Sequence, residues 1–211
     1  MCIRDRNPDV IPLNIMPKGR KRRTTPTIIP HPKFGAECIP SPYNVPESVV
    51  RDSFWAYATE TIYAKSAIPA DTEKQNYSVF PRQYYVDILK SCRDCKHKFI
   101  FFALEQKYWY EELGFYIDAD CVRCTNCRAE DRETKIRFRR FSETIGIPDP
   151  TDEVLETLID DTMFLWHKER YRNENGLRRL KNLANKQIPT RDVTNDINDL
   201  VASIQAQRNA V

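Results

Sequence analysis

Hydrophobic residues recur at helical spacing on both sides of a central segment that is rich in cysteine and aromatic residues. Apolar residues every three to four positions are typical of a helix that packs one face on a core. Before the central segment, such a face is made by Val50, Phe54, Tyr57 and Thr61. After it, the faces of three helices are made by Leu155, Leu158, Ile159, Thr162 and Leu165 or Trp166, by Leu177, Leu180, Leu183 and Ala184, and by Val193, Ile197, Leu200, Val201 and Ile204.

Capping and breaking residues suggest where these helices begin and end. Asn44 followed by Glu47 resembles a capping box, so a helix is expected to start there. Pro150 suits the first position of the next helix, which acidic residues follow. Asn175-Gly176 predicts a helix end, and Pro189 closes the helix after it.

The N-terminal part has a different character. Nine prolines between residues 7 and 46 remove hydrogen-bond donors and disfavour helix, so an extended or disordered arm is expected over residues 1–43. The first six residues, MCIRDR, are what the end of a sequencing adaptor gives when it is translated. We therefore expect these six to be an artefact of sequence assembly.

Composition narrows the class of protein. The 33 basic residues nearly balance the 30 acidic ones, so the net charge of +3 identifies no partner. No apolar run approaches the roughly 20 residues of a membrane span, and no secretory leader is recognisable, which predicts a soluble, cytoplasmic protein without a membrane partner. The chain has seven cysteines, and in that reducing setting those that are clustered are expected to bind metal rather than to form disulfides.

Four of the cysteines form two C-x-x-C pairs. Cys92 and Cys95 are separated by 28 residues from Cys124 and Cys127. Each pair allows the chain to turn so that both sulfurs face one point, and two pairs supply the four ligands of a tetrahedral Zn²⁺ site. Four thiolates fill the metal's shell, so the zinc is expected to be structural rather than catalytic. Neighbouring cations that could offset its negative charge are Arg93, Lys96, Lys98, Arg123 and Arg128.

The local patterns around the pairs favour one arrangement. Residues 98–102 are β-prone, residues 103–113 are expected to form a helix ended by Gly114, and residues 128–141 another helix. A first pair on a knuckle and a second pair at the start of a helix is the treble-clef arrangement, in which the helix dipole stabilises thiolates.

Other uses of these cysteines fit less well. A redox C-x-x-C needs one pair, the haem motif requires histidine one residue before His97, and the bacterial iron–sulfur run lacks its fourth cysteine. Cys121 remains an alternative ligand in place of Cys124 or Cys127, or a small buried residue.

A family resemblance rests on residues 80–130. The matching features are Phe80-Pro-Arg, the residues Tyr85–Cys95 with their C-x-D-C pair, Phe99, Glu105-Gln106, the residues Tyr110–Phe115, and Arg123-Cys-x-x-Cys-Arg128. This stretch resembles the zinc-ribbon, or treble-clef, domain family of bacterial proteins. The resemblance implies zinc bound by Cys92, Cys95, Cys124 and Cys127, and it implies no reaction. The family usually has glycine where this chain has Lys96, so a strained turn is expected there, at a cost of about 1 kcal/mol.

These features lead to one expectation for the fold. The fold class is α+β and mostly α, with a helical segment over residues 44–78, a zinc-binding domain over 79–145 and a helical region over 146–211.

The expected function is that of a binding module. We expect a protein partner, no small-molecule substrate and no enzymatic activity. The alternative is nucleic-acid binding, in which the zinc domain and a basic run contact phosphates. The run consists of Lys18, Arg20, Lys21, Arg22 and Arg23. Tyr108, Trp109 and Tyr110 could stack on bases, but they are expected to pack in the core instead.

Overall fold

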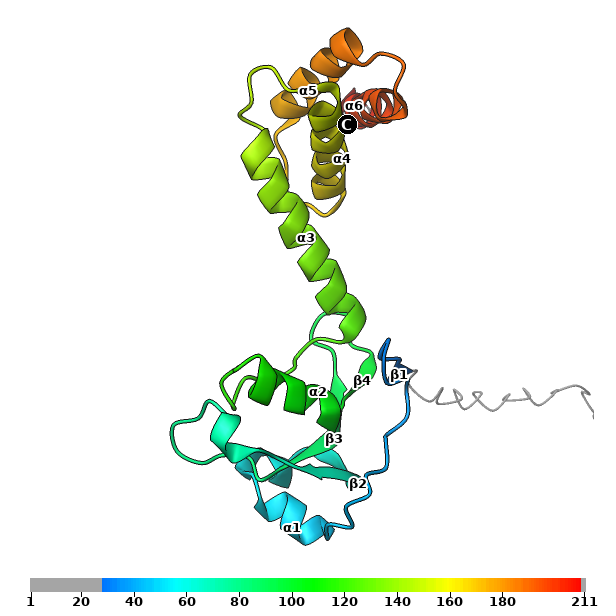
Figure 1. Cartoon of the computed structure of the whole chain (residues 1–211). Helices are drawn as coiled ribbons and strands as arrows, with labels where there is room; N and C mark the ends of the chain where they lie inside the picture. The colour runs from blue at the N-terminus through cyan, green and yellow to red at the C-terminus, as the bar shows by residue number, and fades with distance from the viewer. Residues whose placement is uncertain (1–27, 210–211) are drawn as a thin grey trace, which may run out of the picture.

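The structure is a computed structural model that describes residues 28–209. Its first part is a small sheet with short helices against it, and its last part is a bundle of helices (Figure 1). The long helix α3 joins the two parts as a single rod. The chain is therefore α+β and mostly α, as the sequence predicts.

Four strands form one sheet in the order β1-β4-β3-β2. Their bounds are Ile28–Ile29 for β1, Thr61–Pro69 for β2, Tyr84–Ser91 for β3 and Lys98–Phe101 for β4. The pairs β2–β3 and β3–β4 are antiparallel, and β1 lies parallel to β4. The expected strand over residues 98–102 is thereby confirmed as β4.

The helices of the first part are short. They are α1 (Glu47–Asp52), the 3-10 turns η1 (Trp55–Ala58) and η2 (Thr72–Lys74), α2 (Ala103–Lys107) and the π-helical turn η3 (Tyr108–Glu112). Together, α2 and η3 make up the predicted helix over residues 103–113. Gly114 follows it with φ +65°, the left-handed conformation that ends helices.

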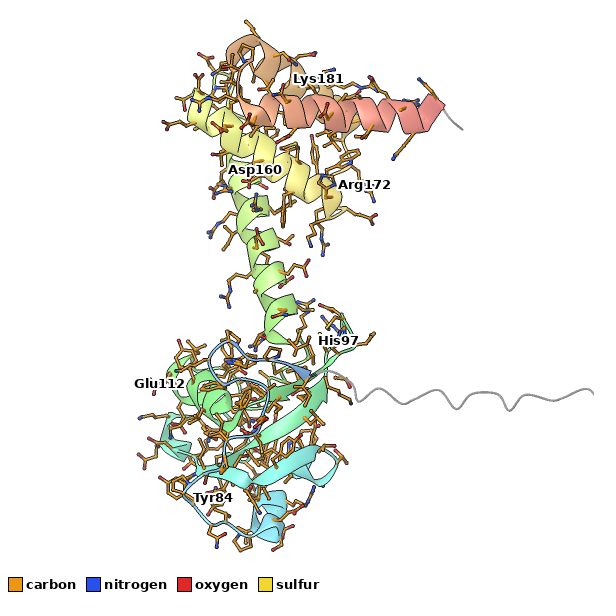
Figure 2. All side chains as sticks on the ribbon, turned by 90° about the vertical axis from the view of Figure 1, so that its right-hand side faces the viewer. Tyr84, His97, Glu112, Asp160, Arg172 and Lys181 are labelled. Atoms are coloured by element: carbon orange, nitrogen blue, oxygen red, sulfur yellow. The ribbon has the colours of Figure 1, made fainter. Side chains whose placement is uncertain are left out.

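The helices of the second part are longer. They are α3 (Thr125–Thr144), α4 (Asp152–His167), α5 (Glu174–Gln187) and α6 (Asp192–Asn209). Phe141 at the end of α3 packs into the core of this bundle with Leu155, Leu177 and Ile197. Figure 2 shows side chains packed densely at both ends of the molecule and a more open middle of α3.

Strand β3 carries the core of the sheet because both of its faces are covered. Successive side chains of a strand point to opposite faces. Val86 and Ile88 pack with Val50 of α1 on one face. Tyr85 packs with Tyr110 of η3 on the other, with ring centroids 5.8 Å apart.

The expected helical segment over residues 44–78 is wrong in its second half. Helix ends at Asp52, a 3-10 turn follows, and residues 61–69 form strand β2. Val50, Phe54 and Tyr57 still pack in one cluster. Residues 61–69 include β-branched and aromatic side chains, and pairing with β3 outweighs the weak local helical pattern.

Three predicted helix boundaries also differ. Pro46 rather than Asn44 precedes α1, and it provides no side-chain cap. Thr151 caps α4, so Pro150 lies outside the helix. Asn175-Gly176 is not a stop, because Asn173 caps α5 by accepting the Gly176 N–H at 3.0 Å. Within residues 28–209, no helix is long and apolar enough to cross a membrane.

Candidate metal centre

The first cysteine pair forms the turn between strands β3 and β4. Cys92 follows the last residue of β3, and its N–H donates to the carbonyl of His97 at 2.8 Å. The Lys96 N–H donates to the Cys92 carbonyl at 3.1 Å. Lys96 has φ +64°, which confirms the strained turn expected there. His97 lies at the end of the sheet from which α3 leaves (Figure 2).

The second pair lies at the start of α3. Cys124 is the residue before the first turn of the helix, with extended backbone, and Cys127 lies within that turn. The Arg128 N–H donates to the Cys124 carbonyl at 3.0 Å. Unpaired N–H groups at a helix start favour negative charge, so this position suits thiolates.

All four sulfurs lie within 4.8 Å of one another. The sulfurs of Cys95 and Cys124 are 3.8 Å apart, too far for a disulfide, and the cysteines are free thiols. A tetrahedral zinc with Zn–S bonds of about 2.3 Å has sulfurs about 3.8 Å apart along each edge. The donor set therefore fits a four-coordinate metal in both chemistry and size.

The segment that contains the four cysteines is similar to a known protein family. Residues 86–135 match the family model described as "Probable treble clef domain". This segment is a treble clef. Its four clustered cysteines are consistent with a metal-binding domain. No curated protein and no solved structure matched the chain.

Cys121 lies beside the treble clef's sulfur cluster but outside it. Its thiol donates to the Arg123 carbonyl at 3.4 Å. It is packed with Phe99 and Phe101, and burial raises the pKa of its thiol to about 12. Its sulfur is not among the four that lie within 4.8 Å of one another, so Cys121 is not placed to bind the same metal ion as those four.

The four clustered thiols of the treble clef differ in acidity. Burial raises the pKa of Cys92, but N–H groups of Cys124, Cys95 and Asp94 outweigh it and lower the pKa to about 6. At Cys127, burial and the three neighbouring sulfurs raise the pKa. The first thiolate therefore forms readily, and a metal cation is needed to hold all four.

The basic side chains near the four cysteines were expected to offset the negative charge of the thiolates, but several of them pair with other groups. Arg123 pairs with Asp94 at 2.8 Å and with Asp131 at 3.3 Å. Arg128 pairs with Glu105 at 2.7 Å, and Lys96 donates to the Arg93 carbonyl at 2.6 Å. Arg123 and Arg128 thus pair with carboxylates rather than with the sulfurs.

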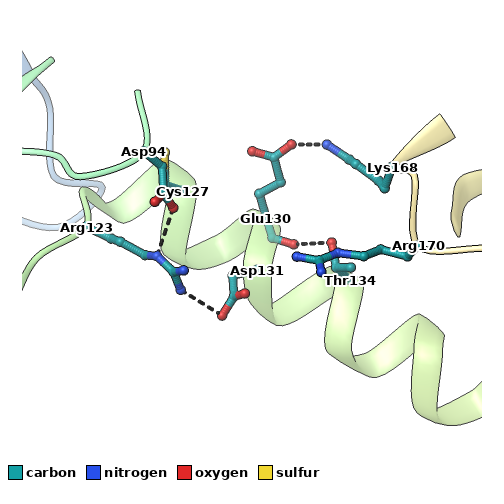
Figure 3. A pocket seen from close by; sticks show the side chains of 8 residues that line it. All are labelled: Asp94, Arg123, Cys127, Glu130, Asp131, Thr134, Lys168 and Arg170. Atoms are coloured by element: carbon teal, nitrogen blue, oxygen red, sulfur yellow. Dashed lines mark hydrogen bonds and ion pairs between the residues drawn. The ribbon is translucent and has the colours of Figure 1, made fainter. Parts of the chain in front are cut away.

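A charged hollow of about 190 Å³ adjoins Cys127. It lies between the first half of α3 and the segment after α4 (Figure 3). Lys168, which follows α4, pairs with Glu130 of α3. This ion pair links the first half of α3, which carries Cys127, to the segment after α4.

The predictions for the basic run and for the aromatic residues 108–110 are not confirmed in full. Lys18, Arg20, Lys21, Arg22 and Arg23 lie outside the described residues. The expectation that aromatic residues 108–110 are core holds for Tyr110, which is fully buried, but not for Tyr108, which is 54% exposed. Sequence reasoning also missed that His31 lies beside Glu105 and Arg128, because these residues come from three distant segments.

Proposed function

We propose that this protein is a non-catalytic binding module whose treble clef is held by one structural Zn²⁺ ion. The ligands would be Cys92, Cys95, Cys124 and Cys127. The observation that carries the proposal is the 3.8 Å separation of the Cys95 and Cys124 sulfurs, which matches an edge of a zinc–thiolate tetrahedron. Four protein ligands leave no position for a reacting water or substrate. Free thiols fit a reducing compartment, so we also propose a cytoplasmic location.

A structural role follows from what the four ligands connect. Cys92 and Cys95 belong to the β3–β4 turn, and Cys124 and Cys127 belong to the start of α3. Apart from the metal, this junction rests on few aliphatic side chains, because its core cluster consists mainly of cysteines and aromatic rings. Structural zinc in small domains contributes about 10–16 kcal/mol of apparent binding free energy, which becomes folding free energy.

Metal content and a cysteine series test the zinc proposal. We expect one zinc ion per chain when the metal content of the purified protein is measured by inductively coupled plasma mass spectrometry. Serine in place of any of the four ligands should remove the zinc and unfold the treble clef. Cys121→Ser is the matched control, because it removes a buried neighbouring thiol and should retain the full zinc content. Loss of zinc from the Cys121 variant, or retention by all four ligand variants, would contradict the proposal.

An exposed apolar surface supports protein binding as the module's task. Trp55, Val79 and Phe80 are 74%, 70% and 75% exposed. All three line one hollow of about 210 Å³ together with Tyr116 and Asp118. Large aromatic side chains exposed side by side are typical of protein interfaces, where tryptophan contributes disproportionately to affinity.

The charge around this surface indicates the chemistry of the partner. Asp118 lines the Trp55 hollow and a neighbouring one that also contains Glu60 and Asp120. Lys90 pairs with Glu60 at 2.9 Å and with Asp120 at 2.7 Å, which leaves Asp118 outside that network. We therefore propose that the partner is a protein segment with apolar side chains and at least one basic residue.

Photo-crosslinking tests this surface. Benzoylphenylalanine in place of Trp55 and of Phe80 should capture the same protein in cells. The control position is Phe138 on α3, which is 47% exposed and should not capture it. Asp118→Lys should abolish capture at both positions, since it repels a basic partner. Capture at position 138, or capture that survives Asp118→Lys, would contradict the assignment.

Nucleic-acid binding is the second candidate function. It is favoured by five basic residues within positions 18–23. Contacts to phosphates release counterions, so binding should weaken steeply as salt rises. Deletion of residues 18–23 should weaken binding of DNA or RNA and flatten its salt dependence, whereas binding that is absent or independent of salt would rule this function out.

A further inference from the structure

A hollow of about 660 Å³ lies between three segments that are distant in the sequence. The loop after β1 contributes His31 and Phe34, α2 and η3 contribute Glu105 and Trp109, and α3 contributes Arg128. Pockets of about 300–1,000 Å³ are the size that small ligands occupy. This hollow shares no lining residue with the one at Trp55, so it is a second surface in addition to the proposed protein-binding surface.

Aromatic rings form much of the wall. Trp109 contacts Phe115 edge to face, with centroids 5.4 Å apart. Phe34 stacks on His31 at 4.6 Å. Tyr108 is 54% exposed, so its ring is available for stacking. Flat rings of this kind bind planar ligands, and nucleobases stack on them without regard to sequence.

The charge of the lining favours an anion. Lys33, Arg128 and Arg132 line the hollow, against one carboxylate, that of Glu105. Arg128 is paired with Glu105 at 2.7 Å. Lys33 and Arg132 form no ion pair with any other residue of the described range 28–209, so their charges remain available to a ligand.

Polar atoms at the hollow lack partners. Glu105 and Arg128 line the hollow, and two of their buried atoms, Glu105 Oε2 and Arg128 Nε, have no hydrogen-bond partner among the described residues. The Nδ1 of His31 accepts N–H groups of Lys33 and Phe34, so the proton of the neutral ring is on Nε2. That Nε2 is 3.7 Å from Glu105 Oε2, too far for a hydrogen bond.

We propose that this hollow binds a nucleotide unit, a planar nitrogen base that carries a phosphate. The base would stack on Tyr108 and Trp109, its polar edge would face Glu105 and Arg128, and the phosphate would lie near Arg132 and Lys33. The unit is either a free nucleotide or part of a single strand, since both offer the same chemistry. In the second case the hollow is the site at which the treble clef contributes to nucleic-acid binding.

Titration calorimetry of the zinc-loaded full chain tests the proposal. The probes are nucleoside monophosphates, the nucleosides without phosphate, inorganic phosphate, and a single-stranded DNA and RNA of ten nucleotides. Binding of a monophosphate with one site per chain, and weaker binding of nucleoside and of phosphate alone, is expected. Tight binding of the strands with weak binding of the monophosphates would assign the site to nucleic acid, and the reverse would assign it to a free nucleotide.

Two variants locate the binding at the hollow. Tyr108→Ala and Arg132→Ala each should weaken it about tenfold, because one removes a stacking ring and the other a phosphate contact. The matched controls are Tyr77→Ala, which removes another exposed ring, and Arg139→Ala, which removes another exposed cation from α3. Both controls should leave binding unchanged.

The outcomes that would overturn the proposal are specific. They are no binding of any nucleotide or strand, or binding that Tyr108→Ala and Arg132→Ala leave unchanged. Deletion of residues 18–23 separates the two nucleic-acid hypotheses. It removes the basic run and leaves the hollow, so monophosphate binding should survive it.

Discussion

Asp161 of α4, whose side chain is fully buried, accepts hydrogen bonds from the guanidinium of Arg140 on α3. Arg137, one helical turn earlier, also pairs with Asp161, at 3.2 Å. Burying a carboxylate without a partner is costly. These two arginines therefore fix how the end of α3 sits on the bundle.

Substitutions of Arg137 and Arg140 should have strongly non-additive effects on the free energy of unfolding. Arg140→Ala should cost at most about 1 kcal/mol, because Arg140 is partly exposed and Arg137 still pairs with Asp161. The double variant Arg137→Ala, Arg140→Ala should cost about 3–5 kcal/mol, since it leaves a buried charge uncompensated. Urea denaturation of the single and double variants measures this, and simple addition of two small effects would contradict it.

Lys96→Gly should tighten zinc binding. Lys96 has φ +64°, which costs a side-chain-bearing residue about 1–2 kcal/mol, whereas glycine adopts it freely. The greater freedom of glycine in the unfolded chain offsets part of the gain. We expect zinc affinity to rise about twofold to fivefold in competition with a chelator, a gain of about 0.5–1 kcal/mol.

Alanine at the same position is the control for the Lys96 prediction. Lys96→Ala also removes the hydrogen bond to the Arg93 carbonyl, but it keeps the backbone strain. Its zinc affinity should not rise. Equal gains in the glycine and alanine variants would show that the side chain, and not the positive φ, is responsible.

Gly176→Ala should destabilise the bundle even though alanine favours helix. A Cβ at Gly176 would collide with the hydroxyl of Tyr171, whose ring packs against Phe141 with centroids 5.0 Å apart. We expect a loss of about 1–3 kcal/mol from this overpacking. Gly146→Ala is the control, since a Cβ there would have nothing within 4 Å of it. Thermal unfolding distinguishes them, and equal melting temperatures would contradict the prediction.

Asp87 should make stability depend on pH. Burial raises the pKa of its carboxyl, although N–H groups of Ala103 and Ile39 donate to it and lower the pKa. The folded protein then holds this proton more tightly than the unfolded chain. The contribution of Asp87 to the free energy of unfolding must fall as pH rises from its ordinary pKa of 3.8 through the raised value.

Comparison with a residue that does not titrate isolates this effect. The free energy of unfolding of the natural protein, minus that of Asp87→Asn, should decrease as pH rises through that interval and be constant at higher pH. Urea denaturation of both proteins, at equal zinc content, measures the difference. An increase with pH would mean that the two N–H donors outweigh burial.

Much of the fold was predictable where the signal is local. The spacing of Leu155, Leu158 and Ile159, with its continuation along α4, is sufficient for a helix, because the periodicity lies within one element. The C-x-x-C spacing likewise predicted the cysteine cluster, since each pair of sulfurs is brought together by its own short turn. Glycine at 114 predicted the helix end correctly for the same reason.

Tertiary contacts decided the rest. Strand β2 exists because residues 61–69 pair with β3, which no pattern within those residues requires. Cys121 lies outside the sulfur cluster because its side chain packs on Phe99 and Phe101, although its spacing from Cys124 would also suit a ligand. Likewise, the hollow lined by His31, Glu105 and Arg128 depends on three segments meeting in space. The sequence by itself determined the local turns and faces, whereas packing free energy, which depends on distant residues, selected among the alternatives they left open.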